Sequence, residues 1–114
     1  MQIPDWYWVK GLHDAQVTDL SFIDFDYDYT KRNPTRNCMT IQLDTRSAMF
    51  DTSIKAIKLL NSKIVQGDTD FVGWFWKDDI LKPSHKGFEL QITLISNRNT
   101  KICKISFENA IVEK

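Results

Sequence analysis

A strict alternation of apolar and polar residues in the last third of the chain constrains its fold more than any other feature. The alternating residues are Phe88, Glu89, Leu90, Gln91, Ile92, Thr93 and Leu94. A period of two is that of a strand with one face in a core and the other in water. The polar segment 96–100 is rich in turn-forming residues, and alternation resumes over 102–107. The sequence therefore predicts an antiparallel hairpin here.

Alternation also predicts a hairpin in the first half of the chain. Apolar residues alternate with aspartates over 23–29, and a second alternating strand begins with Met39, Ile41 and Leu43. Between them, Asn33-Pro34 is a turn signal. Upstream apolar residues have the opposite parity to Ile23, which predicts a β-bulge or bend near Phe22 and Ile23.

The middle of the chain is less decisive. Segment 53–65 fits both a helical face and a strand, and we favour the strand. A turn is expected at 67–70. The apolar run Phe71–Trp76 that follows suits a strand covered on both sides. The segment Pro83–Gly87 is the most loop-like in the interior, and we expect it to be exposed.

Together these elements predict a single domain over residues 1–114 of the mainly β class. The expected architecture is an antiparallel β-sandwich or a strongly curved, partly open barrel with at most one short helix. An α+β fold with a helix at about 53–64 is the alternative. With 114 residues and 42% hydrophobic content, the chain is long enough to bury one core.

Charge and cysteine content narrow the range of functions. The formal net charge is +0, from 15 basic and 15 acidic residues, which disfavours a nucleic-acid partner. No stretch is apolar enough for a membrane span, and the start of the chain does not resemble a signal peptide, so we expect a cytoplasmic protein. Cys38 and Cys103 lack metal-ligand spacing. We expect two buried free thiols, no metal and no cofactor.

The sequence offers weak support for catalysis. His13-Asp14 is the one local acid/base pair, but adjacent strand residues point to opposite faces and no nucleophile motif accompanies them. We favour a structural role, in which Asp14 satisfies backbone donors at the turn after Gly11. His85 is expected to be solvated, and the Asp78-Asp79 pair has no evident partner. We therefore expect a protein that is not an enzyme.

Two groups of residues are candidates for binding. Asp24, Asp26 and Asp28 match the first ligands of a calcium loop, but the glycine and final glutamate of that motif are missing. We expect these carboxylates on the solvated face of a strand, where they form a docking surface for a basic partner. Among the aromatic groups at 6–8 and 74–76, one ring of each is expected in the core. An alternative hypothesis is that exposed rings of these groups anchor a protein partner. The candidate anchors are then Trp6, Trp8 and Trp76.

The segment Gly11-Leu12-His13-Asp14-Ala15, followed by Val17, resembles the opening of many small uncharacterised bacterial β-rich proteins. Asn61 and the run Trp74–Trp76 resemble the same group. Some of these proteins resemble immunity proteins of bacterial toxin systems, which bind and block a cognate toxin. The resemblance implies a non-catalytic protein-binding module, and it transfers no inhibitory residue to this chain.

Two other classes of function stay open. One is a small enzyme or ligand-binding domain with an aromatic-lined pocket near His13 and Asp14. The other is a structural subunit of a homo-oligomer, which predicts a large exposed apolar face.

Overall fold

The computed structural model describes residues 3–9, 11–28, 33–46, 48, 53–85 and 87–114, with the side chains of all of these except 22–37. Every regular element in this part of the chain is a β-strand. The strands are β1 (Gln16–Asp28), β2 (Asn33–Asp44), β3 (Ala56–Leu60), β4 (Lys63–Gln66), β5 (Phe75–Ser84), β6 (Gly87–Ser96), β7 (Asn99–Phe107) and β8 (Asn109–Glu113). The mainly β fold predicted from alternation is confirmed.

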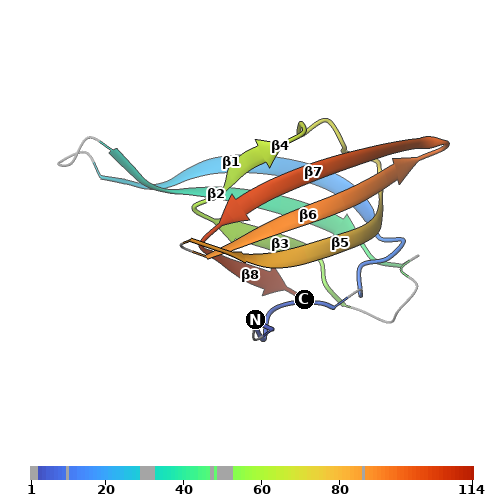
Figure 1. Ribbon diagram of the computed structural model, residues 1–114, viewed down its shortest axis with the longest axis horizontal. Coiled ribbons are helices and arrows are strands. Elements are labelled where there is room, and N and C mark those ends of the chain that lie inside the picture. Colours follow the sequence, from blue (N-terminus) through green and yellow to red (C-terminus); the bar gives the residue numbers. More distant parts are fainter. Residues whose placement is uncertain (1–2, 10, 29–32, 47, 49–52, 86) are drawn as a thin grey trace.

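The strands form one antiparallel sheet in the order β4-β7-β6-β5-β1-β2-β3-β8. Figure 1 shows that this sheet is strongly bent, so that β5, β6 and β7 lie in front of β1, β2 and β3. The two end strands, β4 and β8, do not pair with each other. The molecule therefore has two facing layers made from one open sheet.

The layers are joined at a narrow seam between β1 and β5. Within the described residues, the pairing of these two strands is confined to Gln16 and Phe75. Backbone bonds extend the seam on both sides, from Val17 N to Trp74 O at 2.9 Å and from Trp76 N to Ala15 O at 2.7 Å. The seam is short because β1 and β5 diverge immediately after it.

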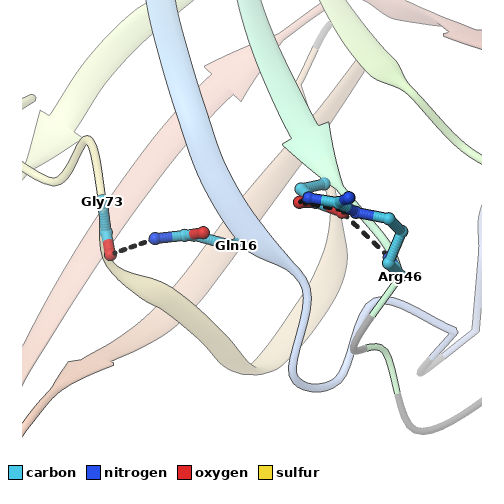
Figure 2. Close-up of polar contacts among 4 residues, drawn as sticks. Gln16, Arg46 and Gly73 are labelled. Carbon is cyan, nitrogen blue, oxygen red and sulfur yellow. Dashed lines mark hydrogen bonds and ion pairs between the residues drawn. The ribbon is translucent and has the colours of Figure 1, made fainter.

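One side-chain hydrogen bond crosses the seam at the surface, and an ion pair lies nearby at the end of β2. Figure 2 shows that the Gln16 amide Nε2 donates to the carbonyl oxygen of Gly73 at 3.1 Å. At the end of β2, the Arg46 guanidinium donates through Nε and Nη2 to the carboxylate of Asp44, with Nη2 to Oδ2 at 2.7 Å. These hydrogen bonds lower the pKa of Asp44 to about 2. Because the pair is exposed, its contribution to stability is small.

A second connection between the layers is made by the chain itself. The link from β3 to β4 and the link from β7 to β8 both pass from one layer to the other, and the two links lie side by side. Asn61 takes a positive φ of 52° at its bend. Its side-chain Nδ2 donates to Glu108 Oε1 at 2.8 Å, and Glu108 N donates to Leu60 O at 2.9 Å. These bonds hold the two bends together.

The core fills the space between the layers. The fully buried residues of the strands come from both layers, and Leu12, Ala15 and Phe71, which lie outside the strands, complete the set. Strand members with no exposed surface are Val17, Met39, Ile41, Ile57, Leu59, Trp76, Leu90, Ile92, Leu94, Cys103 and Ile105. Apolar burial of this kind is the dominant favourable term in folding.

The structure confirms most of the strands predicted from the sequence. β6 and β7 form the predicted hairpin, with Leu90 pairing with Ile105 and Ile92 with Cys103. Segment 53–65 contains β3 and β4, so the strand is confirmed there and the helical alternative is wrong. Segment 67–70 is irregular, as expected of a turn, and Asp68 Oδ1 accepts from Asp70 N at 2.9 Å.

Four local expectations are wrong. The extra residue of β1 lies at Thr18, between Val17 and Asp19, and pairing is continuous through Phe22 and Ile23. The Asn33-Pro34 turn signal lies inside β2, where Pro34 pairs with Tyr27; residues 29–32 lie outside the described part of the chain.

The other two corrections concern β5. The apolar run Phe71–Trp76 becomes strand at Phe75, because Gly73 turns the chain with a φ of 92°. Pro83 and Ser84, expected in a loop, are the last residues of β5 and pair with Phe88 and Gly87. Their exposure is as expected.

The two cysteines agree with the expectation from the sequence. Cys38 and Cys103 are buried free thiols. Burial raises the pKa of the Cys103 thiol to about 11. No helix long and apolar enough to span a membrane occurs in the described residues.

Replacing a core residue tests which layer face is buried. Ile92 has no exposed surface, so Ile92→Ala is expected to lower the free energy of unfolding by about 2 to 5 kcal/mol. Ile102, on the neighbouring strand, is 42% exposed, and Ile102→Ala is expected to cost about 0.5 kcal/mol or less. Urea denaturation of both variants measures the difference. A larger cost for Ile102→Ala than for Ile92→Ala would show that these strands bury the opposite faces.

Candidate functional site

The most unusual chemical feature of the structure is a buried carboxylate among aromatic side chains. Asp79, on the inner face of β5, is 7% exposed. Its Oδ2 accepts from the indole Nε1 of Trp8 at 2.7 Å and from that of Trp76 at 2.8 Å. Its Oδ1 accepts from the phenol of Tyr7. Both carboxylate oxygens are therefore occupied by neutral donors, as a buried acceptor requires.

The rings around Asp79 also pack on one another and on the core. Trp8 meets Trp76 edge to face, with centroids 5.8 Å apart. Trp6 packs in the same way on Phe88 at 5.3 Å and lies 5.8 Å from Phe107. The segment before β1 is thus attached to β5, β6 and β7 by polar bonds to one carboxylate and by aromatic contacts.

The Tyr7 hydroxyl responds to this setting. Burial, then the hydrogen bond to Asp79, and then the negative charges of Asp79 and Asp78 raise the pKa of Tyr7 well above its ordinary value of 10.0. Tyr7 therefore holds its proton as a donor throughout the neutral range.

The three tryptophans proposed as binding anchors do not form an exposed surface. Trp76 has no exposed surface, which removes it from the set of candidate contact residues. Trp6 and Trp8 are partly buried and pack against the core. The described ring contacts of Trp6 and Trp8 are with other aromatic side chains of this chain, among them Phe88 and Trp76. The sequence did not indicate that Asp79 binds the side chains of Tyr7, Trp8 and Trp76.

His13 and Asp14 lie in a turn before β1. His13 Nε2 is 3.7 Å from Asp14 Oδ2, and its Nδ1 contacts the carbonyl oxygen of Lys77. The expectation that the two side chains point apart is wrong, because Asp14 has a φ of 71° and the segment is no strand. The backbone of Asp14, through its bond from N to Trp76 O at 2.8 Å, ties the turn to β5. That bond is made by the backbone, so the expected role of the Asp14 carboxylate in satisfying backbone donors stays a prediction.

An open hollow of about 280 Å³ lies where the β5–β6 turn meets the bends at Asn61 and Glu108. It is lined by Asn61, Ser84, His85, Ser106, Phe107 and Glu108. His85 is exposed, as expected. The lining contains neither His13 nor Asp14, so the two histidines do not share this hollow. The described residues hold no group of three His, Cys, Asp or Glu side chains placed for a metal ion.

Asp24, Asp26 and Asp28 lie in a two-stranded extension of the sheet. We define the arm as residues 24–28 of β1 and 33–37 of β2, which pair from Asp24 with Asn37 to Asp28 with Asn33. β3 pairs with β2 over Cys38–Gln42, and so stops short of the arm. Figure 1 shows the arm projecting from the body of the molecule. The arm's side chains lie outside the described part of the structure.

Comparisons with protein-family models, curated proteins and solved structures give no match to this chain. The resemblance of the segment Gly11–Ala15 to small bacterial β-rich proteins therefore stays a prediction.

Removing the Tyr7 hydroxyl tests the carboxylate cluster. Tyr7→Phe keeps the ring and removes one donor to a buried carboxylate, so the free energy of unfolding at pH 7 is expected to fall by about 1 to 3 kcal/mol. The raised pKa means that the folded state holds the phenol proton when the unfolded chain has lost it. The advantage of wild type over Tyr7→Phe is therefore complete below pH 10 and shrinks as the pH rises above it. Urea denaturation from pH 7 upwards measures this difference, and a constant difference would contradict it.

Proposed function

We propose that this chain is a non-catalytic protein-binding module and that its arm is the contact element. The observation that carries the proposal is the continuation of β1 and β2 beyond the last residue that β3 pairs with. A two-stranded ribbon on its own is marginally stable in water. A partner that packs against such a ribbon would supply the stability that the ribbon lacks on its own.

The sequence of the arm favours a basic partner. Asp24, Asp26 and Asp28 supply three negative charges within five residues of a chain whose formal net charge is +0. Phe25 and Tyr27 alternate with them and supply apolar surface. Local charge of one sign speeds association with a surface of the opposite sign, and aromatic residues are favoured at the centres of interfaces. The partner we propose is therefore a protein with a basic groove or face.

The specific form we favour is an inhibitor of the immunity type, which blocks a toxin by covering it. Inhibition requires complementary shape and charge and no reacting group. The contacts of Asp79 also fit a structural role, since its two oxygens are committed to Tyr7, Trp8 and Trp76. In the part of the chain that the structure describes, each oxygen of Asp79 thus accepts at least one hydrogen bond from within the protein.

Paired capture experiments test the arm. Wild type, Asp24→Asn/Asp26→Asn/Asp28→Asn and the control Asp5→Asn/Asp19→Asn/Asp70→Asn serve as baits in a lysate of the source organism. The control aspartates are exposed and lie outside the arm, and each triple variant loses three negative charges. We expect a partner that wild type and the control retain and that the arm variant loses by at least about tenfold, as for several charge pairs at an interface.

The captured partner is then expressed alone and together with each bait. An immunity function predicts growth arrest that wild type and the control relieve and that the arm variant does not. Equal retention of the partner by both triple variants would remove the arm from the interface. A partner harmless on its own would refute the immunity form of the proposal while leaving the binding module intact.

A further inference from the structure

The segment that closes the structure over Asp79 is short and is held by few groups. We define the strap as residues 3–8. Its described bonds to the body of the molecule come from Tyr7 and Trp8, which donate to Asp79, and its ring contacts come from Trp6 and Trp8. The body of the molecule therefore presents a defined receptor for the strap, with a carboxylate at its centre.

The link from the strap to the body is strained. Val9 follows the strap with a φ of 43°, in a turn closed by the bond from Gly11 N to Trp8 O at 3.1 Å. A β-branched residue rarely adopts positive φ, because its side chain crowds the backbone. Val9 is 55% exposed, so burial of its side chain compensates little for this conformation. Opening the turn would return Val9 to a negative φ.

We propose that the strap exchanges between two copies of this chain, so that Tyr7 and Trp8 of one copy donate to Asp79 of the other. The contacts that hold the strap join it to the receptor, and a second copy reproduces them atom for atom. Exchange in both directions gives a closed, two-fold dimer in which the strain at both Val9 residues is released. The occupant of the receptor in the dimer is thus the same chemical segment as in the monomer.

Two substitutions at Val9 move the equilibrium in opposite directions. Proline fixes φ near −65° and is incompatible with the closed turn, so Val9→Pro favours exchange. Glycine adopts positive φ without strain, so Val9→Gly favours the closed monomer. We expect the dissociation constant of the dimer to be at least about tenfold lower for Val9→Pro than for Val9→Gly, with wild type between them. Sedimentation velocity over a wide range of protein concentrations measures all three.

A mixing experiment identifies the exchanged contacts. In the Val9→Pro background, one chain carries Tyr7→Ala/Trp8→Ala and lacks a functional strap, while the other carries Asp79→Asn and has a weakened receptor. Two-way exchange requires a strap and a receptor from each copy, so we expect both chains to dimerise less than their parent. Their mixture is expected to form heterodimers through the one intact junction.

Three results would overturn the proposal of strap exchange. They are a folded Val9→Pro protein that stays monomeric, equal dimerisation of Val9→Pro and Val9→Gly, and a dimer that survives Tyr7→Ala/Trp8→Ala unchanged. If Val9→Pro fails to fold, wild type against Val9→Gly decides, since the proposal requires wild type to dimerise more tightly. These measurements use no binding partner and are independent of the arm.

Discussion

The carboxylate of Asp79 is the polar group on which the closed structure depends. A buried carboxylate without donors is strongly unfavourable in an apolar core, and this one is satisfied by three aromatic donors from two parts of the chain. Trp76 belongs to the same strand, but Tyr7 and Trp8 arrive from the strap. The sheet and the strap are therefore energetically one unit, because removing the strap leaves Asp79 with one of its three side-chain donors.

The bent sheet explains why such a closure is needed. The two layers share the short seam at Gln16 and Phe75 and the pair of bends at Asn61 and Glu108. The two end strands do not pair, so the sheet does not close around its core. Aromatic rings of the strap cover Phe88, Phe107 and Trp76 instead of another strand. Large rings suit this position because each covers much apolar surface with few ordered residues.

Alternation predicted the strands well, and bulges account for the clearest failures. In β6, Leu90, Ile92 and Leu94 are all buried, as the period of two requires. In β5 the pairing passes from Trp76 to Asp78 with Lys77 as an extra residue. Uninterrupted alternation from Trp76 would turn Asp78 and Ile80 inward. The bulge turns Asp79 inward instead and leaves Ile80 exposed.

The candidate site was not predictable for the same reason. Asp78 and Asp79 look like an ordinary pair of surface charges unless the position of the β-bulge is known. A bulge of one residue has no reliable signal in the sequence. The Trp6-Tyr7-Trp8 group was recognised as unusual, but its partner lies 71 residues away from Trp8 in the chain. Contacts over such separations are set by the topology of the sheet. The aromatic donors could be recognised from the sequence, but Asp79 could be identified as their acceptor only from the topology of the sheet.

The strap precedes the start of β1 and the arm includes the end of β1, so the two contact elements lie at opposite ends of this strand. The seam at Gln16 and the bond between Asp14 and Trp76 fix the start of β1, so exchange of the strap need not disturb the pairing of β1 with β2. A strap-exchanged pair then carries two arms on one particle. Two linked contact elements bind a multivalent or dimeric partner more tightly than either alone, by an effective concentration that the linkage sets. Conversely, partner binding at the arms adds no strain at Val9 and should leave the exchange equilibrium unchanged unless the partner itself bridges two copies.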